Sequence, residues 1–147
     1  MRKTSFKEHN MNTIPLTSII ASLFTLFYLF LSMRIGYLRG SPVMKLILNM
    51  DKKVPENKLE RNVRAHGNFS EYVPLFLILL FITEYFKIIT FNYLIILSFI
   101  FLYGRVAHAI CFAFFDYNPF LRISGMLCTY LILGILSFNL LITTINI

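Results

Sequence analysis

The feature that most constrains this chain is a run of 18 residues without a charge, from Leu16 to Met33. An α-helix rises about 1.5 Å per residue, so this run with its flanks can cross a hydrocarbon core of about 30 Å. Three further apolar stretches follow it. With 57% hydrophobic and 14% charged residues, the chain has more apolar surface than a soluble domain of 147 residues can bury. The chain is therefore expected to be an integral membrane protein.

The apolar stretches and the breaks between them predict four helices. We expect them at about residues 14–38, 60–86, 91–115 and 120–145. Pro74 falls inside the second helix, and Pro119 suits the first turn of the fourth, where its missing N–H costs nothing. The predicted fold class is all-α, a four-transmembrane-helix bundle. One membrane domain is expected over residues 14–147, preceded by a polar tail over residues 1–13.

Basic residues are concentrated in the segment between the first two helices. Residues 34–64 carry eight of the fourteen lysines and arginines. Loops rich in lysine and arginine stay in the cytoplasm, so the first connector, about residues 39–59, is predicted to be cytoplasmic and both termini to lie on the opposite side. The net charge of +7 therefore has a membrane explanation, and no nucleic-acid partner is expected.

Polar residues within the second and third helices follow helical spacing. Arg64, Asn68 and Glu71 stand at i, i+4 and i+7, which is one stripe of an α-helix. Arg105 and His108 stand at i and i+3, again on one face. Since successive helices run in opposite directions, both groups are expected at the cytoplasmic end of the bundle.

The first and fourth helices bring further polar residues to that end. Arg34 lies near the end of the first helix, and Arg122 and Ser124 lie in the first turn of the fourth. Charges at this depth are costly unless they meet partners, water or a ligand. Because Glu71 is a single carboxylate among several arginines, the group predicts a site for an anion.

Simpler interpretations remain open for several of these residues. Arg64 and Glu71 can form a structural ion pair, and His108 can be an interface histidine without a chemical role. Glu84, near the far end of the second helix, is interpreted as interfacial. Basic residues at helix ends can anchor the protein to lipid phosphates, which applies to Arg34, Arg39 and Arg61. The three histidines lack the spacing of metal ligands, so no metal site is predicted.

Residues 60–74, ERNVRAHGNFSEYVP, resemble the second-helix signature of the MAPEG family, the membrane-associated proteins in eicosanoid and glutathione metabolism. That signature reads E-R-x-x-R-A-x-x-N-x-x-E-x-x-P. Residues 105–108, RVAH, resemble the family's third-helix R-V-x-H, and Arg122 falls where a fourth-helix arginine is expected. The resemblance extends over about residues 14–145. Gly67 and Phe112 stand where some mammalian members have an arginine and a ring hydroxyl, which makes the chain look more like the bacterial branch.

The resemblance implies a homotrimer that binds glutathione between neighbouring subunits. Arg122 would then sit at the sulfur and favour the thiolate, with Ser124 a weaker catalytic candidate. The glutathione ligands carried over from the family are Arg34, Arg64, Asn68, Glu71, Arg105 and His108.

The function implied is that of a glutathione-dependent membrane transferase or peroxidase in a bacterial inner membrane. Glutathione would be the co-substrate, and the second substrate would be a lipophilic electrophile or hydroperoxide that arrives from the membrane lipid. One alternative is a non-catalytic membrane binding or scaffold protein of the same fold. Another is a purely structural network of polar side chains between helices.

Overall fold

The computed structural model describes residues 14–40, 42–43, 46 and 55–146. The polar tail expected over residues 1–13 and most of the connector expected over 39–59 lie outside the described residues. The described part contains four long helices, α1 (Pro15–Leu38), α3 (Glu56–Tyr85), α4 (Phe91–Phe114) and α5 (Pro119–Ile145). Each of them is long and apolar enough to cross a membrane. The predicted all-α, four-helix membrane bundle is confirmed.

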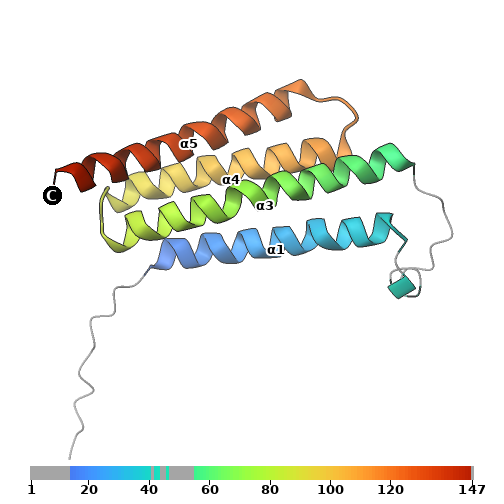
Figure 1. The fold of residues 1–147 in the computed structure, drawn as a ribbon, viewed down its shortest axis with the longest axis horizontal. Helices are drawn as coiled ribbons and strands as arrows, with labels where there is room; N and C mark the ends of the chain where they lie inside the picture. Colours follow the sequence, from blue (N-terminus) through green and yellow to red (C-terminus); the bar gives the residue numbers. More distant parts are fainter. Residues whose placement is uncertain (1–13, 41, 44–45, 47–54, 147) are drawn as a thin grey trace, which may run out of the picture.

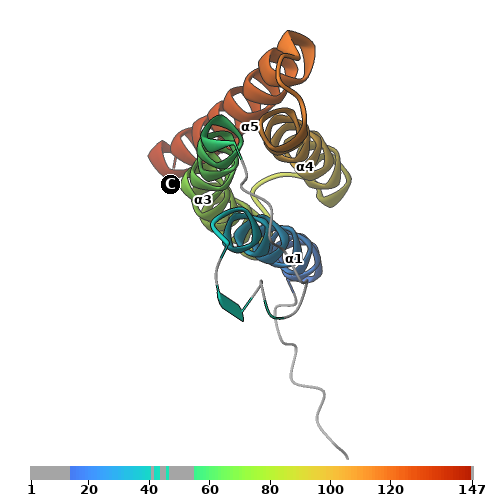
Figure 2. The ribbon, with the colours of Figure 1, turned by 90° about the vertical axis from the view of Figure 1, so that its right-hand side faces the viewer.

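The helices run alternately in opposite directions (Figure 1). Neighbours in the chain pack together, α1 on α3, α3 on α4 and α4 on α5, and α3 also touches α5. Seen end-on, α1 and α5 lie on opposite sides of the α3–α4 pair (Figure 2). We call the end where α1 ends and α3 begins the connector end, and the end where α3 turns into α4 the hairpin end.

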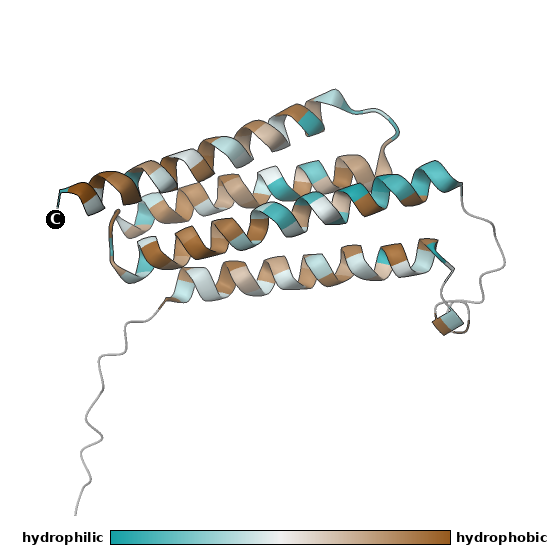
Figure 3. Ribbon diagram, viewed as in Figure 1, coloured by the Kyte–Doolittle hydropathy of each residue, from teal (hydrophilic) through white to brown (hydrophobic). Residues whose placement is uncertain are grey.

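Helix α3 begins at Glu56, four residues before the predicted start near residue 60. Pro55 is its N-cap residue, and Glu56 places a carboxylate in the first turn, where the helix dipole favours negative charge. The helix then continues through Pro74 to Tyr85. Its hydrophilic residues gather in the half toward the connector end (Figure 3). The extra turn therefore lengthens the polar part of α3.

Aromatic rings fill the centre of the bundle where α1, α3 and α4 meet. Phe24 from α1 makes edge-to-face contacts with Phe69, Phe76 and Phe101, at centroid distances of 5.6, 6.1 and 5.9 Å. Phe76 and Phe101 stack at 3.8 Å with an interplanar angle of 7°. All four rings are at most 1% exposed. Such aromatic pairs contribute beyond the area that they bury, so this cluster fixes α3 against α4.

Helices α4 and α5 approach closely at two glycines. A Cβ added to Gly125 would lie 2.7 Å from the Gly104 carbonyl oxygen and 2.9 Å from the His108 Cβ. A Cβ on Gly104 would lie 2.9 Å from the Cys128 Cβ. Small residues at membrane helix interfaces let backbones come together and increase van der Waals contact. Glycine is therefore required sterically at this crossing.

Glu84 holds the start of α1 in place, a capping role that its interpretation as an interfacial residue did not include. Its side chain is buried, and its Oε1 accepts a hydrogen bond from the Leu16 amide at 2.9 Å. Its Oε2 accepts from the Thr17 amide at 2.7 Å and from the Thr17 hydroxyl at 2.5 Å. The first amides of any helix lack partners within the helix, and a carboxylate there also meets the positive end of the helix dipole. Glu84 thus caps α1 from α3.

Replacing Glu84 with alanine is expected to destabilise the protein by about 2–4 kcal/mol, because three buried donors lose a charged acceptor. The measurement is the melting temperature in mild detergent. The matched control is Glu71→Ala, since Glu71 lies on the same helix but is exposed. Equal melting temperatures for the two variants would contradict the capping role.

Candidate functional site

A cavity of about 550 Å³ opens at the connector end, between the start of α3, the end of α4 and the start of α5. Its walls combine charge with apolar surface. The cationic side chains that line it are Arg61, Arg64 and Arg122, and the apolar ones include Phe112, Pro119 and Ile123. Cys111 and the turn residues Asp116, Tyr117 and Asn118 complete the lining.

Positive charge exceeds negative charge around this cavity. Asp116 lies 3.8 Å from Arg61, and Glu60 pairs with Arg64 at 2.6 Å. Three guanidinium groups therefore stand against two carboxylates, and the net charge around the cavity is +1. The Arg122 guanidinium lies 5.5 Å from the centre of the Phe112 ring, and its side chain is exposed. The cavity is suited chemically to an anion that also carries apolar groups.

The turn between α4 and α5 is held by hydrogen bonds to Asn118. The Asn118 side chain accepts from the Leu121 amide at 3.1 Å and so caps α5. Its carbonyl oxygen accepts from the Cys111 thiol at 3.2 Å. With Pro119 at the first helical position, these contacts set where α5 begins and hence where Arg122 lies.

Arg61 is used inside the subunit rather than left free for lipid phosphates. Its Nε donates to the Phe112 carbonyl oxygen at 3.3 Å, and its Nη2 donates to that of Cys111 at 3.2 Å. Its Nη1 also donates to the Asp116 carbonyl oxygen. The last carbonyls of a helix lack partners within the helix and form the negative end of its dipole. Arg61 therefore caps α4, and Arg64 and Arg122 are the cations available to a ligand in the cavity.

Arg34 also binds the end of α4 and does not line the cavity. Its Nη2 donates to the Ala113 carbonyl oxygen at 2.9 Å and its Nε to the Asn62 side chain at 2.6 Å. Its guanidinium lies 4.0 Å from the centre of the Phe114 ring. Within one subunit, these contacts separate Arg34 from Arg64 and Arg122.

Arg105 and His108 form a buried group of their own. They are 1% and 4% exposed. Arg105 donates from Nη1 to the Thr129 hydroxyl and from Nη2 to His108 Nδ1, both at 3.2 Å. Because arginine only donates, Nδ1 of His108 is the acceptor here. Arg105 also lies over the Tyr72 ring at 5.1 Å, and its Nε has no hydrogen-bond partner among the described residues. The group is a buried cation in which one guanidinium nitrogen, Nε, has no partner among the described residues.

The stripe predicted on α3 faces outward from the subunit. Arg64 and Glu71 are exposed and Asn68 is half-buried. Asn68 Nδ2 donates to the Arg64 carbonyl oxygen at 2.9 Å. Arg64 pairs with Glu60, one turn earlier, so the structural pair considered between Arg64 and Glu71 is not the one formed. A Cβ added to Gly67 would meet nothing within 4 Å, so there is open space beside the stripe.

Ser124 lies apart from the cavity lining. Its hydroxyl donates to the Phe120 carbonyl oxygen at 2.7 Å and lies 3.2 Å from the Tyr103 hydroxyl. Of the eight predicted site residues, the structure thus brings Arg64 and Arg122 to one cavity and joins Arg105 to His108. The side chains of Arg34, Asn68, Glu71 and Ser124 make no hydrogen bond to the side chains of either pair among the described residues, and Asn68 bonds only to the Arg64 backbone.

The sequence does not predict three features of this region. Arg61 caps α4, and the Cys111 thiol lines the cavity. The Tyr130 hydroxyl lies 3.3 Å from the Tyr72 hydroxyl. A signal was present for Arg61 alone, because an arginine early in α3 faces the end of the antiparallel α4. Neither the thiol nor the tyrosine pair follows a spacing that the sequence reveals.

Comparison with known proteins points to one family. No curated protein matches the chain. The family model described as MAPEG family matches residues 17–142, which includes all four membrane-crossing helices except their outermost residues. The chain therefore belongs to the MAPEG family, and it is an integral membrane protein of the kind that serves glutathione and eicosanoid metabolism.

Proposed function

We propose that this protein is a glutathione-dependent membrane transferase or peroxidase that works as a homotrimer. The observation that carries the proposal is the cavity at the connector end, where Arg64 and Arg122 stand beside apolar side chains and positive charge is in excess. Glutathione has two carboxylates and one ammonium group. It therefore complements a site that has surplus guanidinium groups and nearby carboxylates.

The homotrimer is supported by the way the predicted ligands are dispersed. Arg64 and Glu71 are exposed on the outer face of α3, so they point away from the rest of the subunit. A ligand bound to this face of α3 is covered by the subunit on one side only, so a second protein surface is needed to enclose it. A neighbouring copy can supply that surface, and Arg34, Asn68, Arg105 and His108 are proposed to bind the tripeptide in the assembled site.

Arg122 is proposed to act on the sulfur. A free thiol with a pKa of about 8.5 is mostly protonated at neutral pH, and a neighbouring guanidinium stabilises the thiolate. In the transferase reaction, the thiolate attacks the electrophilic carbon, a carbon–sulfur bond forms, and the leaving group departs with its electron pair. In the peroxidase reaction, the thiolate attacks a peroxide oxygen, an S–O bond forms as the O–O bond breaks, and the alkoxide leaves and is protonated to the alcohol. The thiol of a second glutathione then attacks the sulfur of the resulting sulfenic acid, which gives the disulfide and water.

The membrane and its orientation are part of the same proposal. We propose the bacterial inner membrane, with the first connector in the cytoplasm and both termini on the opposite side, because the connector and the helix ends that flank it, residues 34–64, hold eight of the fourteen basic residues. The cavity would then open toward cytoplasmic glutathione, while lipophilic substrates reach it from the bilayer.

The test is turnover of an aromatic electrophile with a halide leaving group, and separately of a fatty-acid hydroperoxide, by the purified protein with glutathione. Product formation that depends on both protein and glutathione is expected for at least one of them. Glutathione binding without turnover of either class would instead favour the non-catalytic binding or scaffold protein. Ser124→Ala is expected to have a smaller effect than Arg122→Ala, because Ser124 lies apart from the cavity lining.

A further inference from the structure

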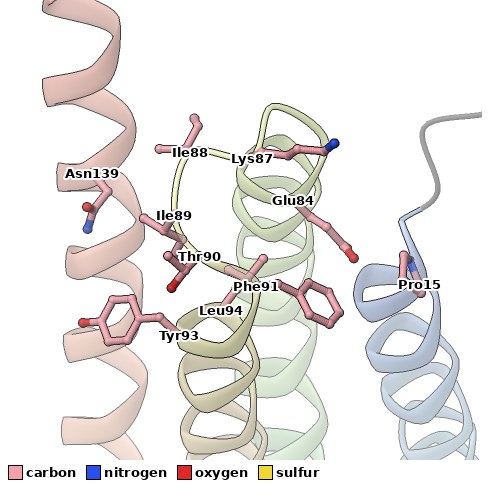
Figure 4. A pocket seen from close by; sticks show the side chains of 10 residues that line it. All are labelled: Pro15, Glu84, Lys87, Ile88, Ile89, Thr90, Phe91, Tyr93, Leu94 and Asn139. Carbon is pink, nitrogen blue, oxygen red and sulfur yellow. The ribbon is translucent and has the colours of Figure 1, made fainter.

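A second cavity lies at the hairpin end, opposite Arg64 and Arg122. Its volume is about 830 Å³, within the range of sites that hold small molecules. Residues from all four helices and from the α3–α4 hairpin line it (Figure 4). The polar ones are Glu84, Lys87, Thr90, Tyr93 and Asn139. Neither the glutathione proposal nor the family match gives this cavity a role.

Exposed aromatic residues place the cavity at the level of lipid headgroups. Tyr85, Phe86, Phe91 and Tyr93 surround the hairpin and are 40%, 67%, 48% and 43% exposed. Tyrosines at the ends of membrane helices sit at the boundary between hydrocarbon and headgroups. A cavity at this level is in contact with headgroups on one side and acyl chains on the other.

The free charge in the cavity is positive. Both oxygens of Glu84 are occupied by donors at the start of α1, so its carboxylate is compensated there. The ammonium group of Lys87 is exposed at the hairpin, and no salt bridge joins it to a carboxylate among the described residues. Thr90 is the N-cap residue of α4, but its side chain makes no capping hydrogen bond and can donate to a ligand. An anionic group with further hydrogen-bonding oxygens complements this lining.

Lys87 also has an unfavourable backbone conformation for its type. Its φ is 52°, and it is the non-glycine residue with positive φ in the described part of the chain. The Ile88 amide donates to the Thr83 carbonyl oxygen at 3.1 Å, which makes Lys87 the left-handed residue that ends α3. Glycine or asparagine adopts this conformation with less strain. Backbone strain of this kind clusters at functional sites in proteins.

We propose that the cavity at the hairpin end binds an anionic phospholipid, with the phosphate at the ammonium group of Lys87. Thr90, Tyr93 and Asn139 lie on the other side of the hairpin from that ammonium group (Figure 4) and are assigned to the glycerol and ester oxygens of the lipid. The acyl chains continue into the bilayer along α4 and α5. The bound lipid would join the hairpin to the starts of α1 and α4 and so stabilise that end of the bundle. This site is separate from the proposed glutathione site.

The test titrates the purified protein in mild detergent with phosphatidylglycerol or with phosphatidylcholine and follows the melting temperature. A ligand that binds only the folded state raises the melting temperature, and at a given concentration a tighter ligand raises it more. Phosphatidylglycerol is expected to give the larger rise. Lys87→Asn removes the charge but suits the backbone, and it is expected to weaken phosphatidylglycerol binding about fivefold and to abolish most of the difference between the two lipids.

Two further variants make the outcome decisive. Lys87→Gly is expected to lose the same preference while its melting temperature without lipid stays equal or rises, because glycine relieves the positive φ. Lys58→Asn removes an exposed lysine at the other end of the bundle and is expected to keep the preference. Equal responses of the unaltered protein to both lipids, or an undiminished preference in Lys87→Asn, would overturn the proposal. If Lys58→Asn lost the preference for phosphatidylglycerol to the same extent, the proposal would also be overturned. The preference would then depend on the net charge of the protein and not on the position of Lys87.

Discussion

Replacing Arg122 with alanine is expected to lower kcat for an electrophilic substrate by about 100-fold, because the sulfur loses the cation that stabilises its negative charge. The Arg122 guanidinium lies in the cavity wall over Phe112 and makes no hydrogen bond to a described residue, so its removal leaves no buried group unpaired. The melting temperature should therefore stay close to that of the unaltered protein. The measurement is initial rate against electrophile concentration at saturating glutathione.

The pH dependence of the same variant tests the mechanism. Without the guanidinium, the pKa of bound glutathione rises toward the free value of about 8.5. The rate of Arg122→Ala should then increase more steeply between neutral and alkaline pH than the unaltered rate does. Arg122→Lys keeps the charge and should recover part of the activity. The matched control is Arg39→Ala, an exposed arginine at the same end of the bundle, which should leave kcat unchanged. An equal loss in the control would contradict a local effect at the sulfur.

Replacing Gly125 with alanine is expected to destabilise the protein by about 1–3 kcal/mol, the usual range for overpacking. The new Cβ would lie 2.7 Å from the Gly104 carbonyl oxygen, and a backbone atom cannot move aside as a flexible side chain can. Helix α5 would have to shift away from α4. His108 would be disturbed as well, since its Cβ is 2.9 Å from the same position. The melting temperature in detergent measures the effect.

The control for Gly125 lies on the same helix. A Cβ added to Gly134 meets nothing within 4 Å, so Gly134→Ala should leave stability unchanged or raise it, as alanine favours helix. Opposite signs for the two substitutions are the expected result. Equal effects would show that helix propensity, rather than the close approach of α4 and α5, decides stability at these positions.

Membrane physics explains why the fold could be predicted from the sequence. An apolar run that crosses the bilayer must be long enough to span it, and its backbone N–H and C=O groups must form hydrogen bonds within the run. Only a helix does both, so four such runs separated by polar segments predict a four-helix bundle. The predicted start of α3, near residue 60, is four residues late, because Glu56 directly follows the charged connector in the sequence. A carboxylate in the first turn of a helix is favourable, and Pro55 ends the connector just before it.

The candidate site could be predicted only in part, because sequence patterns count charges but not backbone acceptors. Helical spacing identified the outward stripe of Arg64, Asn68 and Glu71. It could not show that Arg34 and Arg61 donate to the carbonyl oxygens that end α4. For the same reason the sequence does not reveal that the amides at the start of α1 bind Glu84.

The measurement that most directly tests the central claim is a titration of the purified protein with glutathione. The titration is monitored by the heat of binding and by the ultraviolet absorbance of a bound thiolate. Binding heat together with a thiolate signal is predicted, and Arg64→Ala should weaken the affinity about tenfold or more, because a charge-assisted hydrogen bond is lost. Arg122→Ala should keep most of the heat and lose the thiolate signal. Neither heat nor absorbance from the unaltered protein would contradict the proposal that this chain binds and activates glutathione.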